Sequence, residues 1–363
     1  MHAEGRSIRG NEVQICLLTR GLIGRGHSVH ASCVAGSPLE AELVRLGAQT
    51  TGVRPRGDLD AVSLLRFARW LRRVRPDALL LTSWKRVTTA AAAAKLARVP
   101  RIVQRIGSTH PVPPGPRRTV LRHGVDLIWV NSRDLREHML RSVPGLDPDR
   151  VVMVPNAVAV AGITPAGVRA GLGIAPDVRL VVGAGGLEPR KGFDVLLEAV
   201  ALLPPDVHVA IAGEGKERGA LEALASQSIL ADRVHLLGQR SDVPALMRAA
   251  DAFALASRVE SMPVVVLEAM AAGVPVVATE VSGARELLDA RADRPAAGWV
   301  VPVGDAAALA SALAAALEPG GDGARRGGEA ERRVREEFTP ERLTAAIEAL
   351  LSGDRDEMPR RES

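Results

Sequence analysis

The 363-residue sequence is poor in aromatic and thiol side chains, and each shortage excludes a class of protein. With no tyrosine, four phenylalanines and four tryptophans, the chain lacks the aromatic platforms on which nucleic-acid bases stack. Its two cysteines, Cys16 and Cys33, lie in apolar surroundings without C-x-x-C spacing, so neither a disulfide framework nor a zinc site is predicted. We expect buried thiols in a reducing compartment and no nucleic-acid partner.

Long hydrophobic runs are also missing. No stretch approaches the roughly 18 apolar residues that a membrane-spanning helix needs, and no basic-then-apolar signal segment opens the chain. We therefore expect a cytoplasmic protein. Its basic side chains are mostly arginines, since only four of the 47 Lys and Arg residues are lysines. Residues 1–150 carry a net charge of +13 and the remainder −8, so either an anionic partner approaches the first half or that half has a merely soluble, arginine-rich face.

Short apolar runs alternate with longer amphipathic ones, a pattern typical of parallel sheets with crossover helices. We predict an α/β fold of two doubly wound, Rossmann-like domains that face each other across a cleft. The predicted segments are an N-terminal domain (1–155), a linker (154–167), a C-terminal domain (168–337), a helix that packs back towards the first domain (338–352) and a disordered tail (353–363).

Ten strands are expected, five in each domain. In the first domain they are 28–34, 77–82, 101–106, 126–131 and 150–154, and in the second 179–184, 208–213, 234–238, 252–256 and 275–279. The start of the chain departs from the pattern, because MHAEGRSIRGNEVQICLLTRGLIGRGH has a turn at Gly10 and a helix but hardly any strand. Either the first strand, roughly five residues long, is missing, or the sheet starts one strand short.

A carboxylate interrupts the apolar segment VESMPVVVLEAMAAGVPVVAT. Glu268 lies in its middle, where an unpaired buried charge costs several kcal/mol unless water or a partner meets it. Pro263 suits a first helical turn, so Glu260 lies in the preceding loop, and the amides of Val264 and Val265 are free to bind phosphate. Carboxylates that accept hydrogen bonds from sugar hydroxyls, beside such amides, indicate a nucleotide-sugar site. The alternative is that Glu268 pairs with an arginine at the rim.

A second motif is VVGAGGLEPRKGFDVLLEAV (181–200), in which a strand, a glycine-rich turn and a helix follow one another. Ligands bind at such strand ends in open α/β sheets, and Arg190 and Lys191 would neutralise a pyrophosphate there. The glycine spacing does not match G-x-G-x-x-G, which disfavours a nicotinamide cofactor. A plain turn with surface cations is the alternative.

These motifs resemble a known family. ESMPVVVLE fits the E-x7-E signature of the retaining glycosyltransferases of family 4, which have the GT-B fold. The segments GGLEPRKGFDVLLEA, VHLLGQRSDVPALMRAADAFALASRVE, EAMAAGVPVVATEVSGARELL and GWVVPVGD also resemble the C-terminal domain of this family, in order. In the first half the likeness rests on shorter pieces such as RGNE, VNSRDLREHM and VPNAV.

The resemblance implies transfer of a sugar from a nucleotide diphosphate to an acceptor, with retention of configuration and without a metal or other cofactor. It also implies residue roles. The lysine matched by Lys191 contacts the pyrophosphate, the glutamate matched by Glu268 the ribose, and the one matched by Glu260 the transferred sugar. Gly10 would let the first helix approach the phosphates, and Arg190 would partly replace an arginine of the family that is Gly186 here.

Fewer residues indicate the acceptor site, which the resemblance places in the N-terminal domain. His110 follows a strand end where members of this family often have an acceptor-side histidine, although a lone histidine is more often structural. The segment 63–76 places Leu64, Phe67, Ala68, Leu71 and Val74 on one helical face and arginines on the other. It could lie on an anionic membrane at the inner face, but a helix packed on its own sheet has the same pattern. A lipid-linked or anionic glycan precursor is the expected acceptor.

Three D-x-D triplets, at 58–60, 147–149 and 354–356, imitate the motif of metal-dependent transferases but lie in loops or the tail, so we expect solvated turns. Two further functions remain open for a chain of this architecture. One is a nucleotide-sugar 2-epimerase, and the other is a non-catalytic binding or partner subunit, which the change at Gly186 favours.

Overall fold

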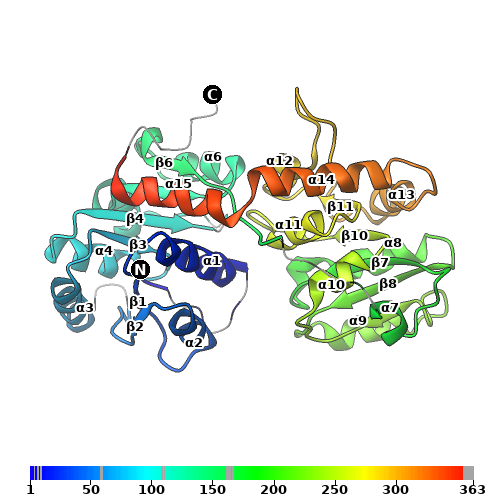
Figure 1. Cartoon of the computed structure of the whole chain (residues 1–363), viewed down its shortest axis with the longest axis horizontal. Helices are drawn as coiled ribbons and strands as arrows, with labels where there is room; N and C mark the ends of the chain where they lie inside the picture. The colour runs from blue at the N-terminus through cyan, green and yellow to red at the C-terminus, as the bar shows by residue number, and fades with distance from the viewer. Residues whose placement is uncertain are drawn as a thin grey trace. The chain divides into compact units, whose positions relative to one another are not determined.

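The computed structural model describes residues 1–3, 5, 8, 10–57, 60–107, 109, 111–160, 165 and 167–354. The chain divides into two compact units, which are described separately. Unit 1 comprises Met1–Ala157 and the C-terminal residues from Pro340, and unit 2 comprises Val158–Thr339. Each unit has parallel strands covered by helices on both faces (Figure 1), as the alternating sequence pattern predicted.

The strands of unit 1 are β1 (His30–Ser32), β2 (Gln49–Thr51), β3 (Ala78–Leu81), β4 (Arg101–Ile106), β5 (Leu127–Val130) and β6 (Val151–Met153). Its helices are α1 (Gly10–Gly24), α2 (Pro38–Arg45), α3 (Ala61–Val74), α4 (Val87–Leu96), α5 (Pro116–Thr119), a π-helical turn (Val120–Gly124), α6 (Arg133–Ser142), a 3-10 turn (Pro148–Arg150) and α15 (Pro340–Ser352). The C-terminal helix α15 lies against α1, β3 and β4, so the end of the chain contributes to the core of its first unit (Figure 1).

The first three residues take the place of the strand that the sequence appeared to lack. His2 bridges both Ser32 of β1 and Leu81 of β3 in parallel. The amide of His2 donates to Leu80 O at 2.9 Å, and the amide of Ala3 donates to Ser32 O at 2.9 Å. Residues 1–3 therefore join the β1–β2 pair to the β3–β4–β5–β6 sheet, and the expectation of a sheet one strand short is wrong. Three residues are too short a run to show a strand pattern in the sequence.

The strands of unit 2 are β7 (Arg179–Ala184), β8 (Val207–Ala212), β9 (Val234–Leu236), β10 (Ala252–Leu255), β11 (Val276–Thr279) and β12 (Trp299–Val301), in the sheet order β12-β11-β10-β7-β8-β9. Its helices are α7 (Val168–Gly171), a 3-10 turn (Pro189–Lys191), α8 (Phe193–Ala201), α9 (Arg218–Ala225), α10 (Val243–Arg248), α11 (Val264–Ala271), α12 (Ala284–Leu288), α13 (Ala306–Ala316) and α14 (Gly323–Glu337).

Both faces of the unit 2 sheet are buried, which explains why its strands read as continuous apolar runs. Along β7, Leu180 and Val182 enter one core cluster and Val181 enters the other. The predicted strands are confirmed within two residues at each end. Two strands were missed, β2 and β12, because each is a three-residue edge strand without a distinctive apolar run.

Candidate functional site: the carboxyl edge of the unit 2 sheet

The strand order of unit 2 reverses direction at β7, in the middle of its sheet. β7 lies between β8 and β10, so the chain runs outward from β7 through β8 and β9 in one direction and through β10, β11 and β12 in the other. At such a switch point the loops that follow the two central strands diverge to opposite faces, and ligands of open α/β sheets bind between them. The loops after β7 and β10 carry most of the side chains that the sequence singled out.

Glycines let these loops approach each other backbone to backbone. Gly192 precedes α8 with φ +63°, and a Cβ at this position would lie 2.0 Å from the carbonyl oxygen of Ala256 after β10. Gly213, after β8, has φ +155°, and a Cβ there would lie 1.8 Å from Gly185 O. A side chain at either position would force the loops apart, so the glycines hold the ends of β7, β8 and β10 together.

The structure brings Lys191 and Glu260 together at this edge. Lys191 Nζ lies 2.5 Å from Glu260 Oε1, and both side chains are only 12–13% exposed. Ser257 Oγ donates to the same carboxylate oxygen at 3.1 Å. Arg190 lies further out, with Nη1 3.7 Å from Glu260 Oε1 and Nε 2.8 Å from Glu188 Oε2. One of the three ammonium donors of Lys191 is thus engaged by Glu260, and the site offers two cations beside one sheltered carboxylate.

Glu268 lies in α11, directly beyond the loop that carries Glu260. Its half-buried carboxylate makes no hydrogen bond or ion pair with any residue that the structure describes. Burial raises the pKa of this carboxyl group to about 7. The rim arginine considered as its partner is therefore not present in the described structure, and the carboxylate keeps its full capacity to accept hydrogen bonds.

The amino end of α11 faces the same edge. Pro263 is the residue before the helix, and no side chain caps it. The amides of Val264 and Val265 have no partner within the helix, because the first turn of any α-helix leaves its N–H groups unpaired. Together with the helix dipole they favour an anion at this end.

The remaining predicted site residues belong to unit 1. Gly10 is the first residue of α1, which follows the short pairing segment of residues 1–3. His110 lies outside the described residues. The roles of Gly10 and His110 stay predictions.

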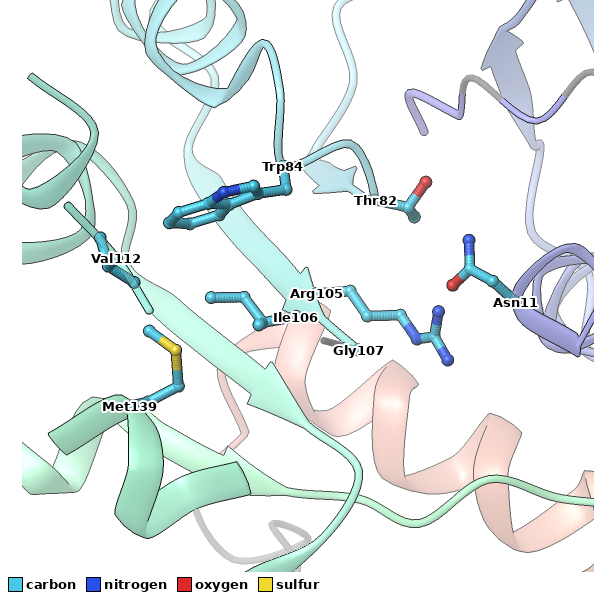
Figure 2. A pocket seen from close by; sticks show the side chains of 8 residues that line it. All are labelled: Asn11, Thr82, Trp84, Arg105, Ile106, Gly107, Val112 and Met139. Carbon is cyan, nitrogen blue, oxygen red and sulfur yellow. The ribbon is translucent and has the colours of Figure 1, made fainter. Parts of the chain in front are cut away.

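Sequence reasoning missed a cavity in unit 1, shown in Figure 2. It has a volume of about 170 Å³ and lies near the carboxyl ends of β3 and β4. Its lining residues are Asn11, Thr82, Trp84, Arg105, Ile106, Gly107, Val112 and Met139. A signal was present in the segment RIVQRI, since Arg105 interrupts a buried strand just as Glu268 interrupts a buried helix.

Two features are absent from the described residues. No group of three or more His, Cys, Asp or Glu side chains among them is placed to hold a metal ion. None of the helices in the described part of the chain is long and apolar enough to cross a membrane.

Comparison with known proteins agrees with the fold. Residues 168–335 match the family model of glycosyl transferases group 1, and residues 9–157 match that of the glycosyl transferase 4-like domain. Unit 2 contains the first match and unit 1 the second. The fold and the two matches agree, since this chain has the two α/β domains of the GT-B fold.

Particular relatives can also be compared. The D-inositol 3-phosphate glycosyltransferase of Mycolicibacterium gilvum is 40% identical over 168 residues, 44% of this chain and 38% of that protein. The lipopolysaccharide core biosynthesis glycosyltransferase LpsE of Rhizobium meliloti is 32% identical over 198 residues, 54% of this chain and 56% of that protein. The matches thus span less than two thirds of either relative.

Among solved structures, Anabaena Alr3699/HepE in complex with UDP superposes with a TM-score of 0.85 at 20% identity, covering 97% of this chain and 98% of that one. A glycosyltransferase from Rickettsia africae gives a TM-score of 0.86 at 18% identity, covering 97% of each chain. At these identities the likeness concerns the fold, and it confirms the predicted GT-B architecture.

Proposed function

We propose that this protein is a retaining, metal-independent glycosyltransferase that moves a sugar from a nucleotide-diphosphate sugar to an acceptor. The observation that carries the proposal is the pairing of Lys191 with Glu260 at the switch point of unit 2, together with the unpartnered carboxylate of Glu268 in the helix that follows. Both family matches support it, and the UDP complex of the structural neighbour HepE is consistent with it.

Each group has a separate task in this proposal. Negative charge develops on the diphosphate as the glycosidic bond breaks, and Lys191, Arg190 and the amino end of α11 stabilise it where it forms. Preorganised donors of this kind contribute about 3 kcal/mol each to transition-state stabilisation. Because the cations and amides already supply positive charge, the diphosphate can leave without a metal ion.

The two carboxylates bind hydroxyl groups. Glu268 accepts hydrogen bonds from the ribose, which requires the ionised form and no competing partner. Glu260 is directed to the transferred sugar, and its contacts to Lys191 and Ser257 hold it in position. When diphosphate binds, Lys191 shares its remaining ammonium hydrogens between Glu260 and the phosphate, so the lysine couples the two halves of the donor.

The expected acceptor is a lipid-linked or anionic glycan precursor, and α3 provides a surface for membrane contact. The apolar face predicted from the sequence, with Phe67, Ala68 and Leu71, is buried in the core of unit 1 and is not available to a membrane. The exposed face combines Val62 and Leu65 with Arg66, Arg69 and Arg73. Apolar side chains beside arginines favour an anionic bilayer surface. Replacing both apolar residues by serine should lower sedimentation with anionic vesicles and leave that with neutral vesicles unchanged.

The donor site is tested by calorimetry with UDP, GDP and ADP, followed by incubation with the matching nucleotide sugars. Lys191→Ala should weaken binding of the preferred nucleotide about ten- to a hundredfold, because a charged hydrogen bond to phosphate contributes about 1.5–3 kcal/mol. Arg179→Ala is a matched control, since Arg179 pairs with Asp206 at the amino end of β7, the opposite edge of the sheet. Equal affinity in wild type and Lys191→Ala would sink the assignment.

The products formed from a nucleotide sugar distinguish the proposed transferase from an epimerase and from a non-catalytic subunit. Transfer that persists in EDTA and yields the retained anomer supports a metal-independent retaining enzyme. Isomerisation of the sugar without acceptor would identify an epimerase, and tight binding without nucleotide release would identify a partner subunit.

A further inference from the structure

The cavity in unit 1 contains an arginine that the fold does not pair. Arg105 lies in β4 opposite Trp129 of β5, and its side chain is 4% exposed. Its guanidinium carbon lies 4.8 Å from the centre of the Trp129 ring, and Nη2 donates to Asn156 Oδ1 at 3.1 Å. Its Nε is buried without any hydrogen-bond partner. No carboxylate of the described residues forms an ion pair with it.

Other buried arginines of this chain show what a structural role looks like. Arg333 donates Nε to Glu329 Oε1 at 3.0 Å and its other nitrogens to the carbonyls of Leu287 and Pro295. Arg233 likewise places Nε on Val207 O and its terminal nitrogens on further carbonyls. Arg105 has one neutral acceptor and one aromatic face where these two have full sets of oxygens.

Leaving Arg105 in this state is costly. A buried charge without a counter-ion destabilises the folded state by several kcal/mol, and a cation–π contact offsets only about 1–2 kcal/mol of this cost. Burial lowers the pKa of Arg105 to about 10, with Glu12 opposing the shift, so the guanidinium still carries its charge at neutral pH. An arginine kept charged and under-bonded beside a cavity is explained if a ligand supplies the missing anion.

The cavity has a polar end and an apolar end (Figure 2). At the polar end, Arg105 lies near Asn11 and Thr82. The Thr82 hydroxyl donates to His2 O at 3.0 Å, so it can only accept a further hydrogen bond, whereas Asn11 has an amide hydrogen to spare. Arg105 and Asn11 are therefore suited to an anion, and Thr82 to a neighbouring hydroxyl.

At the apolar end are Trp84, Ile106, Val112 and Met139. They offer an aromatic and aliphatic wall to the C–H face of a ring. The cavity of about 170 Å³ is close to the engineered cavity of about 150 Å³ that holds benzene, so it takes a single ring rather than an extended chain.

We propose that Arg105, with Asn11 and Thr82, binds an anionic substituent, phosphate or carboxylate, on a single polyhydroxylated ring of the acceptor. This rests on the proposed glycosyltransferase function, of which it specifies the acceptor class. The terminal Nη hydrogens that Asn156 does not engage donate to the anion, which accepts them through two oxygens of phosphate or carboxylate.

The test measures binding of three ring probes by calorimetry, namely glucose 6-phosphate, glucuronate and glucose. Wild-type protein should bind at least one anionic probe at least tenfold more tightly than glucose, and the stronger of the two identifies phosphate or carboxylate as the natural group. Arg105→Gln should weaken that probe about ten- to a hundredfold, and Arg105→Lys should restore part of the affinity. UDP affinity, which reports on unit 2, should not change.

Thermal unfolding distinguishes a ligand-binding arginine from a structural one. Arg105→Gln should leave the unliganded protein as stable as wild type or more stable, because it removes a buried charge and loses one neutral acceptor and one aromatic contact. Arg333→Gln should destabilise the protein strongly, because Arg333 loses an ion pair and two carbonyl contacts. Asn11→Ala, at an exposed position at the start of α1, provides a second variant that keeps the fold and should weaken the anionic probe several-fold.

Three results would overturn the inference. They are equal binding of anionic and neutral probes, unchanged binding in Arg105→Gln, and destabilisation of Arg105→Gln to the level of Arg333→Gln. If UDP binds normally while one of these results is found, the acceptor inference fails and the proposed function stands. If no nucleotide binds while the anionic probe does, the proposed function fails instead.

Discussion

Removing the charge of Glu268 should stabilise the folded protein and weaken its binding of nucleotide, and both effects can be measured. The pKa of Glu268 in the folded protein is raised from 4.5 to about 7, which corresponds to at most about 3 kcal/mol of lost stability above pH 7. The side chain is only half-buried, so water recovers part of this cost, and we expect about 1–3 kcal/mol. Glu268→Gln keeps the shape of the side chain and removes the charge.

The direction of the pH dependence follows from the pKa values of Glu268 in the unfolded and folded states. Below about pH 4.5 the carboxyl group is protonated in both states, and Glu268 and glutamine should be nearly equivalent. Between pH 4.5 and 7 the unfolded chain releases the proton first, so wild-type protein loses stability relative to the variant as pH rises. Above pH 7 the difference is constant.

The assay is urea unfolding of wild type and Glu268→Gln without nucleotide at pH 5, 6, 7 and 8. The variant should gain stability progressively and exceed wild type by about 1–3 kcal/mol at pH 8. Glu318→Gln is the matched control, because Glu318 is exposed in the same unit. The same Glu268→Gln protein should bind nucleotide about tenfold more weakly at pH 8.

The reasoning is refuted if the stability difference does not vary with pH, or if wild type is the more stable protein at pH 8. The first result would show that the carboxylate is solvated or paired in the folded state, and the second that it has a stabilising partner.

Three further predictions concern the framework around the sites. Arg333→Met should cost about 3–5 kcal/mol in urea unfolding, because it leaves the buried carboxylate of Glu329 without its buried partner, and a cost below about 1 kcal/mol would contradict this. The rings of His208 and His235 stack with their centres 5.5 Å apart, and burial lowers the pKa of both. The stability of the folded protein should therefore fall as pH drops below about 6.5, because the unfolded chain binds protons first, and the loss should be smaller in His235→Gln. An identical pH profile of stability in wild type and His235→Gln would contradict this prediction. Gly192→Ala should abolish nucleotide binding by displacing the loop after β10, and normal affinity in calorimetry would show that the loops can separate.

Much of the fold was predictable because parallel strands buried on both faces are continuous apolar runs. The order of these runs predicted two α/β units, and the breaks between them located the loop residues Lys191, Arg190 and Glu260. The short pieces were not predictable. Residues 1–3 form a pairing segment only because β1 and β3 flank them, and their own pattern has no strand signal.

The sequence by itself determined which side chains are anomalous, since Glu268 and Arg105 are charges inside apolar segments whatever the fold. Only the tertiary structure decided what each anomaly means. Hydrogen-bond partners come from segments distant in the chain, so no local pattern could show that Arg333 is fully bonded while Arg105 lacks a partner at Nε. The same holds for Glu260, which meets Lys191 across 69 positions of sequence because β7 and β10 are neighbours in the sheet.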